Sequence, residues 1–344
     1  MEKIGAKETS FLFAILIIST VTLGAISGFA EDFGTLAYVN SAICTALSFL
    51  LVWISKRSLG NSNFYTVVYS AYGQTAGKIF MCLVFILTVL NASLRMGVFT
   101  DAIGSMVLPQ TPRFIIFAVM AICSFFVSYF GFEAITRYAL VCFTVFLAFF
   151  AVILFSSLSE AEVANLKPQG FNGEIVSVIS MLFVFSDIFY VYLISDKIKG
   201  KNSALHAAFI GGGIAILLTL FYVMCVPYPV LGKYSYPFYT LASLTNSSLI
   251  FQRMDGLVFV VWIFASFVSS GALCLFASDI LARVFCLSDR KALSAPVSLM
   301  MFLTSYLGFA GQWVSGAMSF VCFVFLPATA IIFKCKEAKK CEKQ

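Results

Sequence analysis

Long runs of apolar residues, separated by short polar stretches, extend along the whole chain. A helix needs about 20 apolar residues to cross a bilayer, so each uncharged run of that length predicts one crossing. The third run continues past Arg95, whereas residues 292–333 carry no charge over about 63 Å of helix and must turn back near residues 308–313. The pattern predicts an all-α integral membrane protein with ten transmembrane helices. They are expected at residues 11–30, 34–55, 79–107, 114–132, 138–159, 175–195, 204–232 and 256–278, with two more within 292–333.

The composition agrees with a membrane protein. Of 344 residues, 61% are hydrophobic and 11% are charged, whereas soluble domains carry about 25% charge. The mean hydropathy is +0.98. We expect a single transmembrane domain over residues 1–344 that lies in the lipid bilayer, and the net charge of +6 does not indicate a nucleic-acid partner. The first run, preceded by Lys3 and Lys7, could instead be a signal peptide, but it is long for one and contains polar residues that a helix bundle could use.

Basic residues are distributed unequally between the two sides that ten crossings would define. One side, which holds both termini and every second loop, collects 17 of the 22 lysines and arginines. Arg95 lies within a crossing, and the other side has only four basic residues. Because lysine and arginine favour cytoplasmic loops, we expect both termini to be cytoplasmic.

The connecting segments differ in length and character. The larger external loops are expected at residues 156–174 and 226–253, and the second is rich in aromatic residues, proline and serine. We predict that it forms a partly helical cover on the outer face. The basic tail, residues 334–344, could set orientation and contact anionic lipid, or it could dock a partner protein.

No residue pattern points to catalysis. The sequence has no P-loop and no HExxH motif, and its ten cysteines are scattered without a CxxC pair. The only histidine, His206, has no partner at metal-ligand spacing. We expect no enzyme activity, no cofactor and no metal site, and we interpret the cysteines as small hydrophobic residues.

Asp187 interrupts the sixth predicted helix in "MLFVFSDIFYVYL", residues 181–193. A carboxylate near the bilayer centre costs about 2.5–3.5 kcal/mol, so it should face a cavity or a partner. It could hold a proton or a ligand amine beside an unwound segment. Alternatively, it could form a buried ion pair, for which Arg95 is a candidate. Ser186 could form a local bond to the backbone that favours a break in the helix.

The first predicted helix contains "STVTLGAISG", residues 19–28, in its middle. These small and polar residues could permit close helix packing, or they could mark a broken helix whose backbone binds substrate. Transporters with two inverted five-helix repeats break the first helix of each half. Because irregular helices 1 and 6 occupy corresponding positions, we favour a 5+5 inverted repeat, with repeats at about 10–159 and 171–334.

The third predicted helix carries Asn91 and Arg95 four residues apart on one face. Asp101 lies six residues beyond Arg95, or about 600° of helix, so it points elsewhere and needs a different partner. We expect Arg95 to act as a structural clamp between helices.

The eighth predicted helix carries a polar stripe that starts at Asp255 and includes Ser269. The offsets between its members keep them on one face, which could line a site or simply pack inside the bundle. Asp279 and Arg283, four residues apart, are expected to pair with each other. The other members of the stripe are Trp262, Ser266 and Ser270.

Several stretches together resemble the spore-germination permeases, the B subunits of bacterial germinant receptors. "LRMGVFTDAIGSMVLPQTP" (94–112) is similar to the third-helix signature of that family, and "YGQTAGK" (72–78) to the entry before it. "GFEAITR" (131–137), "YPFYTL" (236–241) and "FQRMDGLVFVVWIF" (251–264) follow in the family's order. The signature residues are Arg95, Asp101, Pro109, Pro112, Glu133, Arg137, Tyr236, Pro237, Arg253 and Asp255.

The resemblance implies the LeuT-like fold of the amino acid–polyamine–organocation superfamily. It also implies a nutrient sensor in the bacterial cell membrane or spore inner membrane, which binds a small germinant, usually an amino acid, and signals to A-type and C-type receptor subunits. A secondary amino acid transporter coupled to H⁺ or Na⁺ is the alternative, and a scaffold that has lost ligand binding is a third.

On this basis we expect a ligand pocket between helices 1, 3, 6 and 8. Unwound backbone N–H groups of helix 1 would receive a ligand carboxylate. Asp187 would receive a ligand amine or a proton. The expected pocket residues are Thr20, Thr22, Leu23, Gly24, Ala25, Asn91, Arg95, Val184, Ser186, Asp187, Trp262, Ser266 and Ser270.

Overall fold

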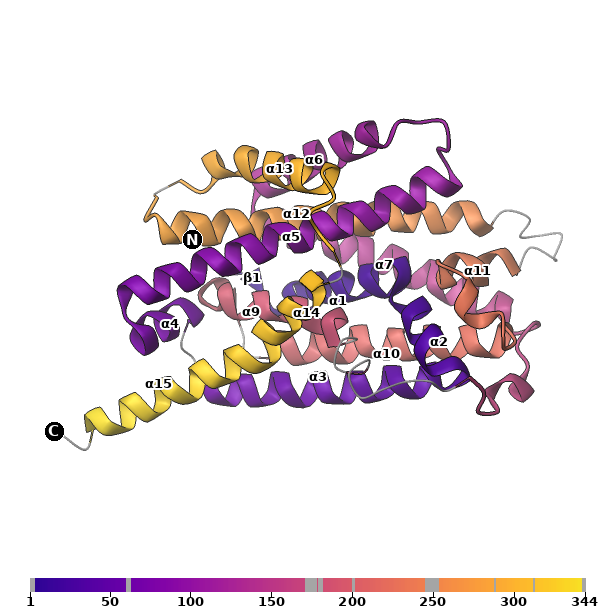
Figure 1. Ribbon diagram of the computed structural model, residues 1–344, viewed down its shortest axis with the longest axis horizontal. Helices are drawn as coiled ribbons and strands as arrows, with labels where there is room; N and C mark the ends of the chain where they lie inside the picture. The colour runs from indigo at the N-terminus through magenta and orange to yellow at the C-terminus, as the bar shows by residue number, and fades with distance from the viewer. Residues whose placement is uncertain are drawn as a thin grey trace.

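The described part of the chain is a bundle of long helices, with one pair of two-residue strands (Figure 1). The computed structural model describes residues 4–59, 63–170, 178, 182–199, 202–244, 254–287, 289–311 and 313–341.

Helix α1 (Ala6–Thr20) lies at the centre of the bundle. It packs against α10 (Ser203–Cys225), α7 (Phe132–Ser157) and α12 (Met254–Val284). Every residue from Leu12 to Ile18 is fully buried, which explains why this helix is apolar on all its faces.

The first predicted helix is broken, as its polar and small residues indicated. Residues Val21–Ala25 (η1) form a wide π-type turn, and Gly24 has φ 148° and ψ −8°, outside the helical range. Helix α2 (Ile26–Phe33) then leads to the 3₁₀ turn η2 (Gly34–Leu36) and to α3 (Ala37–Leu59). The break is shorter than the unwound stretch that we expected, because Gly24 alone within η1 leaves helical geometry.

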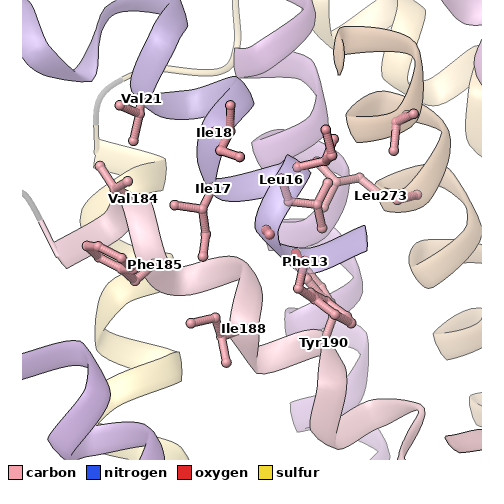
Figure 2. Close-up of a cluster of buried hydrophobic side chains, with 14 of the residues drawn as sticks. Phe13, Leu16, Ile17, Ile18, Val21, Val184, Phe185, Ile188, Tyr190 and Leu273 are labelled. Atoms are coloured by element: carbon pink, nitrogen blue, oxygen red, sulfur yellow. The ribbon is translucent and has the colours of Figure 1, made fainter. Parts of the chain in front are cut away.

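The sixth predicted helix is also irregular. From Leu182 onward it consists of the 3₁₀ segment η4 (Leu182–Ile188) and the short helix α9 (Phe189–Leu193). The Ser186 hydroxyl donates to the Phe183 carbonyl at 2.6 Å, which is the local bond that the sequence suggested. Figure 2 shows Val184, Phe185 and Ile188 of η4 beside the apolar side chains of α1.

Beyond α9, the chain joins the start of α1. The 3₁₀ turn η5 (Ser195–Lys197) leads into β2 (Ile198–Lys199), which pairs in parallel with β1 (Ile4–Gly5). The two broken helices therefore contact each other both at this end and along the α1–η4 packing.

The remaining helices follow the predicted order. Helix α5 runs without a break through Arg95, as predicted, and α13 ends before the expected turn, where Gly308 has φ 68°. Helix α4 lies in the segment between the second and third predicted helices. The elements are α4 (Phe64–Tyr72), α5 (Gln74–Met106), α6 (Arg113–Phe130), η3 (Val163–Leu166), α13 (Lys291–Tyr306), α14 (Trp313–Phe320), η8 (Val321–Phe325) and α15 (Leu326–Cys341).

Among the described residues, seven helical segments are long and apolar enough to cross a membrane. The first of these, Ala6–Leu59, contains both α1–α2 and α3, whereas Leu182–Leu193 and α13 are too short to qualify. All ten predicted segments contain helix, but length and composition do not confirm ten crossings.

The outer loop and the tail are helical where they are described. The loop contains η6 (Leu231–Lys233) and α11 (Pro237–Leu244), and α11 packs against α7, α12 and η1 as a cover. The rest of this loop, 245–253, lies outside the described residues. The basic tail is not a separate segment up to residue 341, because α15 continues through it.

Candidate ligand site

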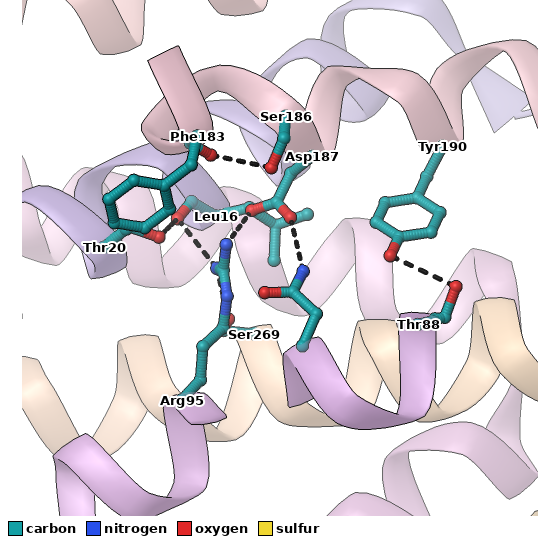
Figure 3. Close-up of polar contacts among 10 residues, drawn as sticks. Leu16, Thr20, Thr88, Arg95, Phe183, Ser186, Asp187, Tyr190 and Ser269 are labelled. Carbon is teal, nitrogen blue, oxygen red and sulfur yellow. Dashed lines mark hydrogen bonds and ion pairs between the residues drawn. The ribbon is translucent and has the colours of Figure 1, made fainter. Parts of the chain in front are cut away.

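Arg95 and Asp187 form an ion pair inside the bundle (Figure 3). The Nη2–Oδ2 distance is 2.5 Å, and the Asp187 side chain is fully buried while that of Arg95 is 10% exposed. Arg95 Nη1 also donates to the Leu16 carbonyl at 3.3 Å and to Ser269 Oγ at 3.1 Å. One guanidinium thus joins α5, η4, α1 and α12, which confirms the clamp predicted for Arg95.

The second carboxylate oxygen of Asp187 is bonded as well. Asn91 Nδ2 donates to Asp187 Oδ1 at 3.3 Å. One turn further along, the Tyr190 hydroxyl donates to Thr88 Oγ1 at 3.2 Å. A buried charge pair is stable only when such additional hydrogen bonds satisfy its remaining atoms. Of the two alternatives for Asp187, the structure therefore contains the buried ion pair with Arg95.

The periodicity of α5 explains this cluster. Thr88, Asn91 and Arg95 are three and four residues apart, so they lie on one face of the helix, toward η4 and α9. The sequence prediction included Asn91 and Arg95 but missed Thr88, which the same spacing could have identified. It also missed the Leu16 carbonyl, since a backbone atom leaves no signal in the residue types.

The helix 1 residues of the expected site lie at the break, but their side chains bond locally. Thr20 Oγ1 donates to the Leu16 carbonyl at 3.1 Å, and Thr22 Oγ1 to the Ile18 carbonyl at 2.8 Å. Their hydroxyl protons are therefore used within the helix. The neighbouring residues Leu23, Gly24 and Ala25 complete η1.

The polar stripe of α12 faces the interior, as predicted. Trp262 is fully buried against the rings of Tyr236 and Phe259. Ser269 bonds Arg95, and Ser270 Oγ donates to the Ser266 carbonyl at 2.6 Å. Asp255 lies within α12, but its side chain is outside the described residues, as is all of Arg253.

Three buried polar atoms near this cluster have no hydrogen-bond partner in the part of the chain that the structure describes. They are Arg95 Nε, Trp262 Nε1 and Ser266 Oγ. Ser266 and Trp262 lie one and two turns from Ser269, toward Tyr236 and the cover helix α11. A buried polar group without a partner costs about 1–3 kcal/mol, so these three atoms are available to a partner from outside the described residues.

Other family-signature residues lie away from the cluster. Asp101 pairs with Arg113 at 3.3 Å on the surface, so it does not share a partner with Arg95, as the helical geometry predicted. Glu133 pairs with Arg137 at 2.5 Å, also on the surface. The remaining described signature residues lie at the ends of helices: Pro109 and Pro112 in the corner before α6, Tyr236 just before α11, and Pro237 at the start of α11.

A second ion-pair network lies at the opposite end of α12 from α11. Asp279 pairs with Arg283 at 3.0 Å, as predicted, and also with Lys197 at 2.5 Å. Arg283 further pairs with Asp196 at 2.9 Å. Burial lowers the pKa of Lys197, against the opposing effect of Asp279. No pattern of residue types had indicated that η5 would join this network.

Solved structures of known transporters share the fold. The chain is similar to Mhp1, a nucleobase-cation-symport-1 family transporter, in a closed conformation with bromovinylhydantoin bound, with a TM-score of 0.68 and 14% identity over 96% of this chain and 78% of that chain. It is also similar to inward-facing Mhp1, with a TM-score of 0.65 and 13% identity over 96% and 76%. At this identity the likeness concerns the fold alone, and it confirms a LeuT-like fold with irregular helices 1 and 6.

Sequence comparison identifies the family. No curated protein sequence matches the chain. The sequence model described as "Spore germination protein" matches residues 3–312, nearly the whole length. The family model and the seven apolar helical segments among the described residues indicate a multi-pass membrane protein. The chain belongs to the spore germination protein family.

Proposed function

We propose that the protein senses a nutrient by binding a small ligand, an amino acid, next to the Arg95–Asp187 pair. The observation that carries this proposal is the set of buried polar atoms without a partner, Arg95 Nε, Trp262 Nε1 and Ser266 Oγ, beside two irregular helices. Buried polar atoms are usually hydrogen-bonded, so three without a partner beside the broken helices are available to a ligand.

The chemistry of the cluster fits a zwitterion. The guanidinium N–H, the indole N–H and the serine hydroxyl can donate to a carboxylate. Asp187 is the acceptor for an ammonium group, which would share the carboxylate with Arg95 and Asn91. The residues proposed to contact the ligand are those named from the sequence in helices 1, 3, 6 and 8, with Ser269 added because it bonds Arg95.

The family suggests how ligand binding is transmitted. We propose that the ligand changes the contacts between α1 and η4, and that A-type and C-type receptor subunits detect the change. The protein would act in the spore inner membrane, with both termini cytoplasmic. The direct packing of the two broken helices supports this route, since a ligand at the Arg95–Asp187 pair touches both.

Binding can be tested on the purified protein by thermal shift against amino acids, sugars and nucleosides. A ligand that binds only the folded protein raises stability by RT ln(1 + [L]/Kd), about 2.7 kcal/mol at one hundred times Kd. We expect an amino acid to give the shift and Ser266→Ala to weaken it. Ser319→Ala, which changes a buried serine on α14, is the matched control. A shift that Ser266→Ala leaves unchanged would contradict the proposed site.

A coupled amino acid transporter is the second candidate. The fully buried Asp187, between irregular helices of a LeuT-like fold, favours it, because such a carboxylate can carry a proton across the membrane. Proteoliposomes with an imposed H⁺ or Na⁺ gradient separate the two functions. Accumulation of labelled ligand supports transport, whereas binding without accumulation supports sensing.

A further inference from the structure

An open apolar groove runs between α6 and α13, which lie together at one edge of the bundle in Figure 1. Its volume is about 340 Å³. Small residues line it on both helices, among them Ala121, Ala295 and Ser298. Ile122 and Leu299, 55% and 57% exposed, form its rim. In a multi-pass membrane protein, this apolar edge faces lipid.

The two helices touch directly beneath the groove. Ser298 Oγ donates to the Ala121 carbonyl at 2.6 Å, and the hydroxyls of Ser128 and Ser294 are 2.9 Å apart. Helices in such contact lie about 8–10 Å apart, whereas a third helix is itself about 10 Å wide. A single hydrocarbon chain is narrower than a helix, so it can lie in the groove between them.

One end of the groove carries a positive charge. Lys291 lies one turn before Ala295 on α13, and Tyr129 lies one turn after Phe125 on α6, so both continue the faces that line the groove. Lys291 Nζ is 5.1 Å from the centre of the Tyr129 ring, which in turn packs on Phe125 at 5.9 Å. The nearby Asp289 carboxylate accepts the Lys291 backbone N–H at 2.9 Å. The Lys291 side chain is exposed at the end of the apolar path.

We propose that the α6–α13 groove and Lys291 form a binding site for one anionic phospholipid. The acyl chain lies over Ala121 and Ser298, between the rim residues Ile122 and Leu299, and the phosphate pairs with Lys291. Bilayer lipid is as apolar as the groove, so the chain gains packing but no hydrophobic free energy on entering it. Selectivity therefore comes from the charge at Lys291, and the site prefers anionic over zwitterionic headgroups.

The probe is phosphatidylglycerol with a photoreactive group in its acyl chain, compared with phosphatidylcholine of the same chains, in the full-length protein in detergent. We expect crosslinks within α6 and α13, with phosphatidylglycerol favoured. Lys291→Gln should reduce this preference about fivefold, the effect of one lysine near a charged lipid surface. Ala295→Phe should reduce crosslinking by both lipids, because its ring fills the groove. Lys78→Gln, an exposed lysine at the start of α5, is the matched control.

Four results would overturn the proposal. Crosslinks outside α6 and α13 would place the lipid elsewhere. An unchanged preference in Lys291→Gln, or an equal loss in Lys78→Gln, would show that Lys291 does not select the headgroup. A dimer in native mass spectrometry that Ala295→Phe dissociates would assign the groove to a second copy of the chain. If Ala295→Phe does not fold, the surface variant Lys291→Gln still tests whether Lys291 selects the lipid headgroup.

Discussion

Replacing Asp187 by asparagine removes one charge from the buried pair and keeps the shape of the side chain. Arg95 then remains 90% buried without a counter-charge, which costs about 3–5 kcal/mol in buried pairs. Because Arg95 keeps its bonds to the Leu16 carbonyl and Ser269, we expect the lower value, about 3 kcal/mol. With an unfolding entropy of about 0.7 kcal/mol/K for a chain of this length, the midpoint should fall by about 4 °C.

The assay is the fraction of monodisperse protein that survives heating in detergent, measured by size-exclusion chromatography. Arg95→Met should lose stability as Asp187→Asn does, because each variant leaves one buried charge unpaired. The double variant Arg95→Met/Asp187→Leu should recover most of the loss, since no charge remains. Asp101→Asn is the control, because its pair with Arg113 is exposed and contributes less than about 1 kcal/mol.

A double variant as unstable as the single ones would refute charge compensation at this pair. That result would mean that the shape of the site determines stability instead. A midpoint for Asp187→Asn equal to that of the unmodified protein would likewise show that the ion pair contributes nothing to the folded state.

Three further predictions concern other parts of the fold. Gly24→Ala should lower the free energy of unfolding by about 1–3 kcal/mol, because alanine is strained at the Gly24 φ of 148°. Gly97→Ala in α5 should raise the free energy of unfolding by up to about 1 kcal/mol, because a Cβ there meets nothing within 4 Å. Equal thermal midpoints of the two variants would argue against strain at the break. Folding lowers the pKa of Lys197 from 10.5. Between the pKa of the folded protein and that of the unfolded chain, the unfolded chain binds more protons, so the free energy of unfolding should rise with pH there. Lys197→Met should lack this rise in unfolding measured across that pH window, and a rise of the same size would contradict the burial effect. Glu133→Gln should change the midpoint by less than the equivalent of about 1 kcal/mol, because the Glu133–Arg137 pair is exposed; a larger loss would give this pair a structural role.

Helical periodicity made part of the site predictable. Asn91 and Arg95 were assigned to one face, and Asp101 to another, from their spacing alone, and the structure has Asp101 on Arg113 instead. The same rule predicted the Asp279–Arg283 pair within α12. These relations are local, because a helix fixes the direction of each side chain relative to its neighbours a few residues away.

Contacts between distant segments were only partly predictable. Arg95 was a candidate partner for Asp187, 92 residues away, but nothing in the sequence placed the Leu16 carbonyl beside it. Lys197 joins Asp279 across 82 residues, and no spacing of residue types indicated that pair. Such contacts depend on how helices pack, which residue types alone do not encode.

The sequence by itself determined the membrane environment, the order of the helices, the irregularity of helices 1 and 6, and the family. Each follows from the type and spacing of nearby residues, since hydrocarbon requires long apolar runs and small or polar residues weaken a helix within them. The tertiary structure alone decided which atoms meet at the Arg95–Asp187 pair, and that the Thr20 and Thr22 hydroxyls donate to carbonyls of their own helix. The physical reason is that a buried charge is stabilised by the polar atoms within about 3 Å of it, and the packing of distant helices determines which atoms those are.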